Sequence, residues 1–204
     1  MKPISLAVTG LHSFREKQVI DFESLCEGGV FGIFGPTGSG KSSILDGMTL
    51  ALYGKVERAS NNTQGIMNHA ENQLEVSFLF ELENANGKQR FKVERTFKRT
   101  DDIRVKSGIS RLTEVKDEEH IVIADKASEV NQAIQEILGL TIDDFTRAVV
   151  LPQGKFAEFL SLKGADRRQM LQRLFQLEKY GDQLSRKIKE ELQEKTRLLG
   201  QIHA

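Results

Sequence analysis

The alternation of apolar and polar residues predicts a β-rich first two thirds of the chain. Segments in which every second side chain is apolar are expected to form a half-exposed sheet. Asn86 and Gly87 lie between two of these segments and favour a tight hairpin, because both residues tolerate positive φ. The predicted strands are residues 4–8, 18–22, 74–82, 90–97, 109–115 and 120–123.

Residues 28–35 differ from these strands because they are almost continuously apolar. This pattern predicts a strand that is buried on both faces and ends at Gly35. After a glycine-rich turn, apolar residues recur at helical spacing from residue 41 to residue 53, and Gly54 is expected to end that helix. The prediction is a buried strand, a glycine loop and a helix in succession.

The last third of the chain is predicted to be mainly helical. Residues 126–138 form a helical pattern that Gly139 ends, whereas residues 148–151 favour a buried strand broken at Pro152. From about Asp166 onward the chain is densely charged, and apolar residues spaced by three and four mark one stripe on a long helix. Periodicity leaves two interpretations open: the start of a coiled coil, or an amphipathic helix packed on the preceding domain.

Composition limits the classes of protein to which the chain can belong. Its 204 residues are 39% hydrophobic, which suffices for one sizeable core, and its apolar runs are far shorter than the roughly 20 residues that a bilayer span needs. Cys26 is the single cysteine, so an intrachain disulfide is excluded and a reducing compartment is expected. We recognise no targeting segment at the N-terminus. Because 29 basic residues balance 29 acidic ones, any electrostatic argument must be local.

The most specific motif is a phosphate-binding loop. Gly35, Gly40, Lys41 and Ser42 complete the pattern G-x-x-x-x-G-K-S between the predicted strand and helix. Glycines let backbone N–H groups face phosphates, the lysine reaches the β and γ phosphates, and the serine hydroxyl can ligate Mg²⁺. The residues predicted to bind a nucleotide with Mg²⁺ are Gly35, Pro36, Thr37, Gly38, Ser39, Gly40, Lys41, Ser42 and Ser43.

A catalytic carboxylate for hydrolysis is not recognisable in the sequence. A P-loop NTPase that hydrolyses its nucleotide holds Mg²⁺ through a carboxylate after a buried strand and positions the attacking water with a further polar residue. The nearest match, residues 120–126, is expected to be surface structure in which Asp125 caps a helix. Gln153 follows "VVLP", where it can meet the metal and an attacking water; a solvated turn glutamine is the alternative.

Four segments together resemble the SbcC family, the SMC-like ATPases of bacterial DNA double-strand-break processing. They are GLHSFREKQVIDF, GPTGSGKSSILDGMTLALYG, AVVLPQGKFAEFL and DRRQMLQRLFQLEKY, and in this order they cover almost the whole chain. The resemblance implies an α/β fold, a P-loop NTPase of ABC/SMC type. Its N-terminal lobe, residues 1–165, would have a mixed β-sheet and β-hairpins around the P-loop helix. Residues 166–204 would form an amphipathic helix that begins a coiled coil.

The resemblance also implies partners. Members of the family continue into a long antiparallel coiled coil with a zinc hook and return with a C-terminal lobe that bears the signature motif, the acidic strand and the catalytic glutamate. The chain is then expected to be an N-terminal lobe that hydrolyses ATP with Mg²⁺ only together with that C-terminal lobe. Further implied partners are a second copy of the head, an SbcD-type nuclease subunit and double-stranded DNA ends. The implied location is the bacterial cytoplasm at the nucleoid, with no membrane partner.

Roles at the metal are implied residue by residue. Gln153 matches the family's Q-loop glutamine, which senses Mg²⁺ and the γ-phosphate. The resemblance therefore implies Lys41 and Gln153 as catalytic residues, and Ser42 and Gln153 as the residues at the metal.

Nucleotide contacts outside the P-loop are implied at five further positions, His12, Ser13, Arg15, Met67 and His69. The segment "LHSF" matches one that contacts nucleotide, although relatives often have Arg at the position of His12, and Arg15 could replace that charge. Met67 and His69 fall in a loop that closes over the base in relatives. A plain polar loop is the alternative for these two residues.

Basic residues cluster between residues 88 and 111, where nine of them stand against three acidic residues in a chain that is neutral as a whole. Such clusters favour DNA because each neutralised phosphate releases counterions. With the family resemblance, Lys98, Arg99 and Arg104 are interpreted as DNA contacts; a solvated hairpin is the alternative.

Two other functions stay open, an ABC-transporter-type ATPase subunit and a self-contained P-loop small-molecule kinase. A transporter subunit needs a surface for a membrane partner, and a kinase needs its own catalytic carboxylate and arginines in a lid. The charged C-terminal helix disfavours the first, and the lack of a recognisable carboxylate disfavours the second.

Overall fold

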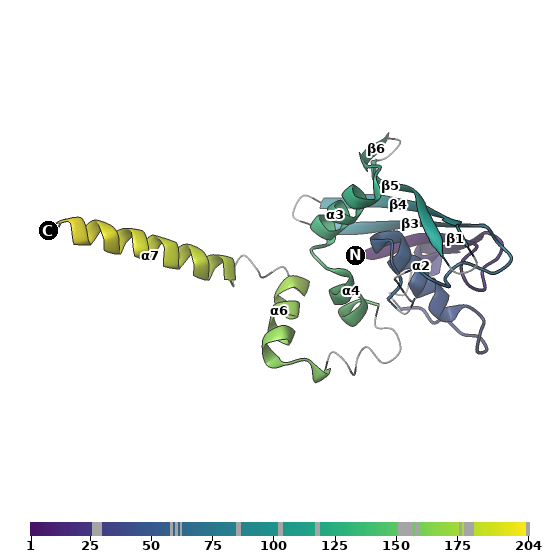
Figure 1. Ribbon diagram of the computed structural model, residues 1–204, viewed down its shortest axis with the longest axis horizontal. Helices are drawn as coiled ribbons and strands as arrows, with labels where there is room; N and C mark the ends of the chain where they lie inside the picture. The colour runs from purple at the N-terminus through teal and green to yellow at the C-terminus, as the bar shows by residue number, and fades with distance from the viewer. Residues whose placement is uncertain are drawn as a thin grey trace. The chain divides into compact units, whose positions relative to one another are not determined.

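The computed structural model divides the chain into two compact units, Met1–Leu138 and Gly139–Ala204, which are described separately (Figure 1). The structure describes residues 1–25, 30–57, 59, 61, 63–84, 87–101, 104–116, 119–150, 157, 160–175, 177 and 182–202. Within these residues, every helix is too short or too polar to span a bilayer.

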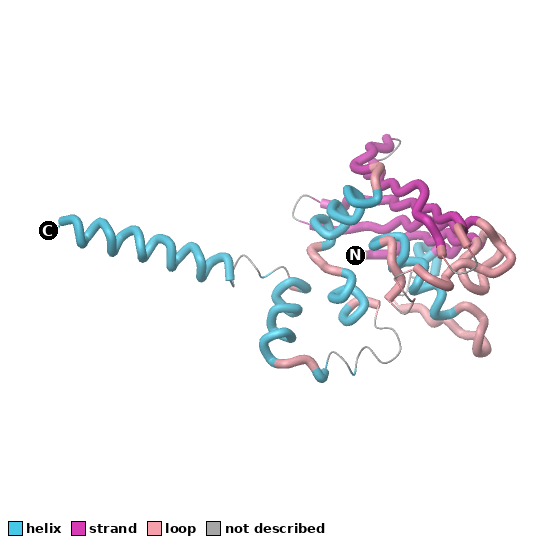
Figure 2. The backbone as a smooth tube through the Cα atoms, in the orientation of Figure 1, coloured by secondary structure: helices cyan, strands magenta, loops and turns pink. Residues whose placement is uncertain are grey.

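The first unit is built on a six-stranded sheet in which each pair of neighbouring strands is antiparallel (Figure 2). The order across the sheet is β2-β1-β3-β4-β5-β6. The predicted hairpin is confirmed, since Asn84 pairs with Gly87; Asn86 lies outside the described residues. The strands are β1 (Lys2–Thr9), β2 (Gln18–Asp21), β3 (Gln73–Asn84), β4 (Gly87–Arg99), β5 (Val105–Lys116) and β6 (Glu119–Ala124).

Alternate residues of these strands form the core, as their sequence pattern predicts. Phe78 lies opposite Val93 and Phe80 lies opposite Phe91 in the β3–β4 register, and all four side chains are buried. The rings of Phe80 and Phe91 have centroids 5.7 Å apart. Burial of each such side chain stabilises the fold by about 1.5–3 kcal/mol, so this hairpin supplies much of the core.

Helices cover the buried side chains of the sheet. Helix α2 (Lys41–Tyr53) contacts β1, β3 and β4, and helix α3 (Ala127–Leu138) contacts β5 and β6 (Figure 1). A Cβ on Gly47 of α2 would lie 3.0 Å from Cγ1 of Val8, so the helix and β1 approach closely because this position is glycine. Gly54 ends α2 with a φ of 67°, as predicted, and a short helix α1 (Phe22–Leu25) follows β2.

The segment before the P-loop departs from its prediction. The sequence predicts a buried strand that ends at Gly35, but residues 30–35 have no regular secondary structure, and Val30 and Phe34 are 86% and 93% exposed. A strand forms only where a neighbouring strand pairs with it, and both of its faces are buried only where layers pack on both sides of the sheet. The described strands pair among themselves and leave residues 30–35 without such neighbours. The described sheet is therefore antiparallel rather than mixed.

The second unit contains the helices α4 (Ile142–Ala148), α6 (Gly164–Leu174) and α7 (Asp182–Ile202). The predicted stripe lies on α7, where Leu184, Ile188 and Leu192 are exposed. The prediction of one helix from residue 166 is wrong, because α6 ends at Leu174 and the next residue, Phe175, has a ψ of 8°, outside the helical range. The predicted division of the chain after residue 165 stays a prediction.

The described part of residues 148–151 does not form the predicted strand, and Leu151 lies outside the described residues. Ala148 is the last residue of α4, and Val149 and Val150 lie in a turn and a bend. A capping box starts α4: the hydroxyl of Thr141 accepts from the N–H of Asp144, and the carboxylate of Asp144 accepts from the N–H of Thr141, both at 3.2 Å.

Candidate functional site

The P-loop leads into the N-terminus of α2, and its backbone requires glycine. Gly40 precedes the helix with a φ of 89°, in the left-handed region, and provides no capping side chain. A Cβ at this position would lie 2.8 Å from Oγ of Ser13 and 2.9 Å from Cζ of Phe14. Glycine is therefore required both by the backbone conformation and by the close approach of the segment that contains Ser13.

The ammonium group of Lys41 lies over the loop that precedes it. Its Nζ donates to the carbonyl oxygens of Gly35 at 2.7 Å and Pro36 at 2.6 Å, and it lies 3.5 Å from Oγ of Ser39. The first N–H groups of a helix have no partner within that helix, and the helix dipole favours negative charge there. The lysine cation and these N–H groups form a site that suits the phosphates of a nucleotide.

The residues at the start of α2 also fit a hydrated Mg²⁺ ion. Ser42 is exposed at the second helical position and presents a hydroxyl oxygen, the hard type of ligand that Mg²⁺ prefers. Pro36, Thr37 and Gly38 are exposed in the loop, whereas Ser43 is buried behind it. Gln153, the other predicted residue at the metal, lies outside the described residues.

Two segments far apart in the sequence meet beside the P-loop helix. The N–H of His12 donates to the carbonyl oxygen of Ile66 at 2.8 Å, and the N–H of Asn68 donates to that of Gly10 at 2.9 Å. The side chain of Asn68 also donates to the carbonyl oxygen of His12 at 2.6 Å. These hydrogen bonds hold residues 10–12 against the loop around Met67. The structure thus brings together three predicted parts of the site: the P-loop, residues 12–15 and the loop that contains Met67 and His69.

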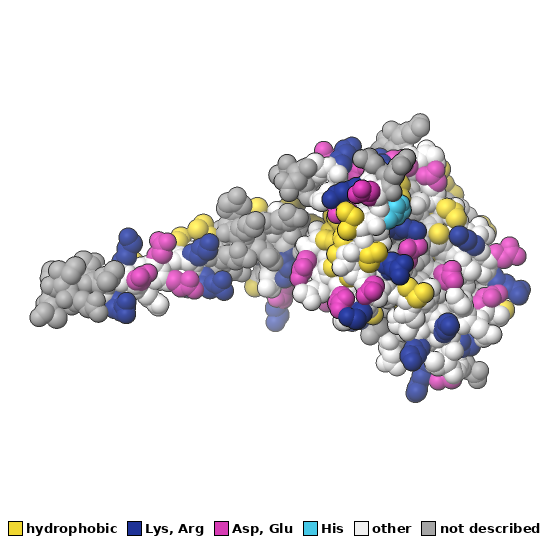
Figure 3. Space-filling view, turned by 90° about the horizontal axis from the view of Figure 1, so that it is seen from above, with side chains coloured by type: hydrophobic (Ala, Val, Ile, Leu, Met, Phe, Trp, Pro, Cys, Tyr) yellow, Lys and Arg dark blue, Asp and Glu magenta, His cyan; other side chains and the backbone are white. Residues whose placement is uncertain are grey.

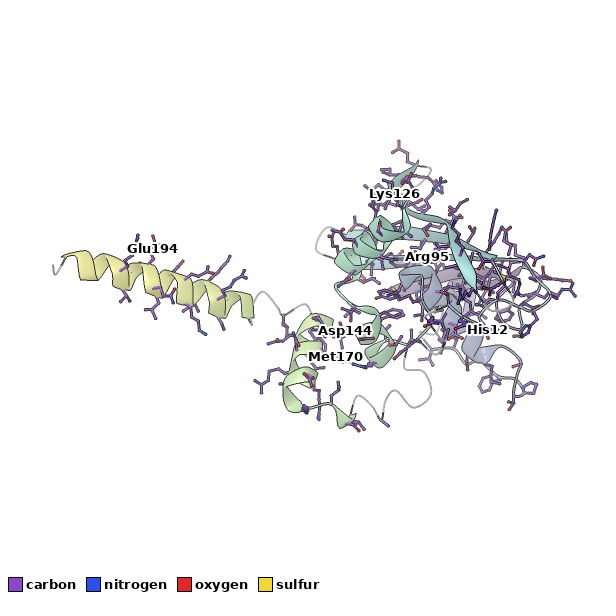
Figure 4. All side chains as sticks on the ribbon, in the orientation of Figure 1. His12, Arg95, Lys126, Asp144, Met170 and Glu194 are labelled. Atoms are coloured by element: carbon purple, nitrogen blue, oxygen red, sulfur yellow. The ribbon has the colours of Figure 1, made fainter. Side chains whose placement is uncertain are left out.

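The predicted contacts in residues 12–15 have distinct surroundings. The imidazole of His12 faces α2, with Nε2 3.4 Å from Oδ2 of Asp46, and Figure 4 labels it near the P-loop helix. Ser13 lies against Gly40. The guanidinium of the exposed Arg15 donates to Glu71 at 2.7 Å, and this hydrogen bond raises the pKa of Arg15. Arg15 therefore has an acidic partner of its own.

Met67 and His69 differ in accessibility. The side chain of Met67 is 4% exposed, and its backbone forms a bridge with Leu11; its predicted contact with the base stays a prediction. Its apolar side chain is part of the core beneath the loop. The sequence did not indicate this burial, because the neighbouring residues in the loop are mainly polar. His69 is exposed and accessible to a ligand.

The basic cluster of residues 88–111 is divided between the core and the surface. Arg95 is 2% exposed and is bonded to the last turn of α2, so it adds nothing to a surface cluster. The guanidinium of Arg99 donates to the carbonyl oxygens of Asn68 at 2.7 Å and Glu71 at 3.0 Å, and it holds the loop that contains His69. Both arginines therefore have structural roles. The alternation in the sequence does not distinguish them from the basic residues at the surface.

Lys98 and Arg104 are the two predicted DNA contacts that stay accessible. Lys98 is exposed, and Arg104 is exposed beside Asp101, with an Nε–Oδ2 distance of 3.7 Å. On the face of the molecule seen in Figure 3, basic and acidic side chains are interspersed. The DNA contacts predicted at these two residues stay a prediction.

In the second unit, one carboxylate joins two helices. Asp144 of α4 accepts two hydrogen bonds from Arg173 of α6, both at 2.7 Å, and a third from the hydroxyl of Thr141 at 2.7 Å. Burial alone would raise the pKa of Asp144, but these hydrogen bonds outweigh it and hold the pKa below its ordinary value. The sequence did not reveal this pair, because the spacing of Thr141 and Asp144 indicates only the capping box and Arg173 lies 29 residues further along the chain.

Comparison with known families matches residues 5–203 to the family described as AAA domain. Over 194 residues the chain is 70% identical to the SbcC protein of the nuclease SbcCD from Bacillus subtilis, covering 95% of this chain and 17% of that protein. It is 49% identical over 209 residues to the corresponding SbcCD protein of Clostridium acetobutylicum, covering 99% of this chain and 18% of that protein. The chain thus spans less than a fifth of the length of these relatives.

Among solved structures, the chain is similar to the SMC head domain from Thermotoga maritima. The two share 20% sequence identity, and the match covers 65% of this chain and 42% of that one, with a TM-score of 0.34.

Proposed function

Because the chain belongs to the AAA domain family, we propose that it is the N-terminal half of a split ATPase head of the SbcC type. The chain binds ATP with Mg²⁺, and a C-terminal lobe completes the catalytic site. Two such heads dimerise around ATP, and their opening and closing regulate an SbcD-type nuclease at double-stranded DNA ends. The P-loop at the N-terminus of α2, with Lys41 2.6 Å from a loop carbonyl oxygen, is the observation that supports this function most directly.

The residues of the nucleotide site have separate tasks in this proposal. Lys41 and the N–H groups of residues 40–43 bind the phosphates, and Ser42 and Gln153 hold Mg²⁺. When bound, MgATP supplies the γ-phosphoryl group that is transferred to water. Gln153 couples the metal to movement between lobes, and the C-terminal lobe contributes the catalytic base and the signature serine. Similarity to proteins named as parts of the nuclease SbcCD supports the nuclease partner.

The exposed segment before the P-loop supports a split head. Val30 and Phe34 expose most of their apolar surface although their sequence is typical of a buried strand. Large apolar side chains in such a position mark a surface that a partner covers. We infer that the C-terminal lobe supplies the missing strand neighbours and so places residues 30–35 in a sheet.

The DNA contacts of the assembled head are proposed at Lys98 and Arg104, since both side chains are accessible. Arg99 holds a loop through two backbone carbonyl oxygens and is assigned a supporting role. Helix α7 is proposed as the beginning of the coiled coil, because Leu184, Ile188 and Leu192 form an exposed apolar stripe.

Nucleotide binding is tested by replacing the P-loop lysine. Lys41→Ala is expected to abolish binding of ATP with Mg²⁺, as measured by titration calorimetry, because it removes the cation from the phosphate site. The melting temperature should stay close to that of the parent chain, since the side chain contributes little to the core. Retained affinity for ATP in a folded Lys41→Ala variant would refute the site.

A further inference from the structure

Strand β6 forms one edge of the six-stranded sheet. It is the last strand in the sheet order, and among the described strands it pairs with β5 alone (Figure 1). Residues 119–122 pair with β5 in a regular register, and the register shift lies toward the other end of β6, between Leu112 and Thr113 of β5. Alternate N–H and C=O groups of an edge strand point away from its neighbour. The regular part of β6 therefore offers backbone groups to a further strand.

The side chains along this edge are apolar and exposed. Ile121, Val122 and Ile123 are 44%, 52% and 42% exposed, although helix α3 contacts the strand. Natural edge strands are commonly protected by lysine, proline or a bulge, and residues 119–122 have none of these. Three consecutive exposed apolar residues on such an edge indicate a surface that another polypeptide covers.

Both ends of this edge are acidic. Glu119 and Asp125 are exposed, and within the described residues neither carboxylate lies within ion-pair distance of a cation. The nearest lysines in the sequence, Lys116 and Lys126, are each paired with another carboxylate, at N–O distances of 3.2 and 2.9 Å. A strand that pairs with the whole of β6 would therefore meet a carboxylate at each of its ends.

These charges distinguish between the possible occupants of the edge. The carboxylates repel the phosphates of DNA. A second copy of this chain is also disfavoured. The antiparallel register that aligns the three apolar residues of both copies would place Glu119 opposite Asp125 of the second copy, and like charges directly opposite each other destabilise a strand pair. The complementary occupant is an extended segment with basic residues on both sides of an apolar centre.

We propose that the edge of β6 is a docking site for such a segment of a partner protein, which adds to the sheet as a further strand. Backbone hydrogen bonds to β6 and contacts with Ile121, Val122 and Ile123 hold the segment. Glu119 and Asp125 select basic residues at its two ends. The site uses no residue of the nucleotide site and is independent of the proposed function.

The test uses a short labelled peptide of alternating valine and threonine with lysines at both ends, titrated against the whole chain. Fluorescence anisotropy measures its affinity, and hydrogen exchange measures protection of the amides of residues 119–124. The peptide should bind about three- to tenfold more tightly than the same peptide with glutamates at both ends, because both ion pairs are exchanged for repulsion. A peptide that is N-methylated along its pairing edge should bind at least about tenfold more weakly, because it lacks the donors for β6.

Variants of the chain test the same contacts. Val122→Lys places a charge on the edge and should weaken binding at least about fivefold, with a melting temperature close to that of the parent chain because the side chain is half exposed. Ile109→Lys is the matched control and should keep the affinity, since Ile109 is an exposed apolar residue of β5 that does not pair with β6. Glu119→Lys should reduce the preference for lysine over glutamate at the ends of the peptide.

The inference would be overturned if the methylated peptide bound as tightly as the unmodified one, or if the protected amides lay outside residues 119–124. A dimer of the parent chain that Val122→Lys converts into a monomer would also contradict it, because a second copy would then be the occupant. ATP binding through Lys41 should be the same in all these variants. A negative result with the peptides would therefore leave the proposed function unaffected.

Discussion

The guanidinium of Arg95 in β4 donates to the carbonyl oxygen of Ala51 in the last turn of α2, with an Nε–O distance of 2.6 Å. Its Nη2 also donates to the carbonyl oxygen of Leu52 at 2.9 Å and to Asn131 of α3 at 2.7 Å. Burial lowers the pKa of Arg95, which is labelled in Figure 4, to about 10. The group therefore stays charged at neutral pH. This cation complements the negative end of the α2 dipole and ties the P-loop helix to the sheet and to α3.

Arg95→Met is expected to lower the free energy of unfolding by about 2–4 kcal/mol, because buried carbonyl oxygens at the end of α2 lose their donor. Urea denaturation measures the change. Arg90→Met is the matched control on the same strand, because Arg90 is partly exposed and its pairs with Glu81 and Glu23 should contribute about 1 kcal/mol or less. Equal losses in the two variants would contradict the anchoring role of Arg95.

Asp144→Asn is expected to lower the stability of the second unit by about 3 kcal/mol near neutral pH, because it breaks a buried bidentate pair with Arg173. The pKa of Asp144 is lowered in the folded state, so its stabilisation is present above the unfolded value of about 3.9 and is lost as the pH falls through the folded value. The parent chain should therefore lose more stability than Asp144→Asn below about pH 4.

Circular dichroism during urea denaturation at several pH values tests this prediction. Asp143→Asn is the control, since Asp143 is the more exposed neighbour in the same helical turn and should cost about 0.3–1 kcal/mol through the helix dipole. A parallel loss of stability in the parent chain and Asp144→Asn at acid pH would show that Asp144 has no part in the acid transition.

Replacing both Lys98 and Arg104 by Glu should weaken the salt dependence of DNA binding by the assembled complex. The slope of log K against log salt concentration should become shallower by about one to two units. Fluorescence anisotropy at several salt concentrations measures this slope. Lys116→Glu, at an exposed position on β5 outside the basic cluster, should leave it unchanged. An unchanged slope in the double variant would refute the DNA contact. Arg99→Glu should instead lower the free energy of unfolding, because it removes the hydrogen bonds to the carbonyl oxygens of Asn68 and Glu71.

Local patterns were sufficient to predict much of the first unit. The alternation in β3 and β4, the hairpin before Gly87 and the ends of α2 depend on neighbouring residues, so they could be recognised in the sequence. The P-loop could be predicted for the same reason, since it is one continuous segment in which Gly40 needs a positive φ.

Features that depend on distant residues could not be predicted. The apolar pattern of residues 30–35 is typical of a buried strand, but a strand forms only where neighbouring strands are present, and the described sheet offers none to this segment. Likewise, β4 places Arg95 on the core face, where only the carbonyl oxygens of α2 and the side chain of Asn131 make its burial favourable. The burial of Met67 depends on its bridge with Leu11, a residue far away in the sequence.

The split-head proposal depends on the apolar surface of residues 30–35. Phe34→Ser removes an aromatic side chain that is 93% exposed, so it should leave the stability of this chain almost unchanged. It should weaken association with the C-terminal lobe of the full-length protein, because the variant no longer offers that side chain for burial. A variant that associates as tightly as the parent chain would mean that this surface is not the one the lobe covers.

ATP turnover by this chain, alone and then mixed with the C-terminal lobe, tests the central claim most directly. The split-head account predicts negligible turnover alone, turnover that appears on mixing, and a further increase with the nuclease partner and DNA. Lys41→Ala should abolish the activity of the mixture. Robust turnover by the isolated chain would contradict the account, because the chain would then contain a complete catalytic site of its own.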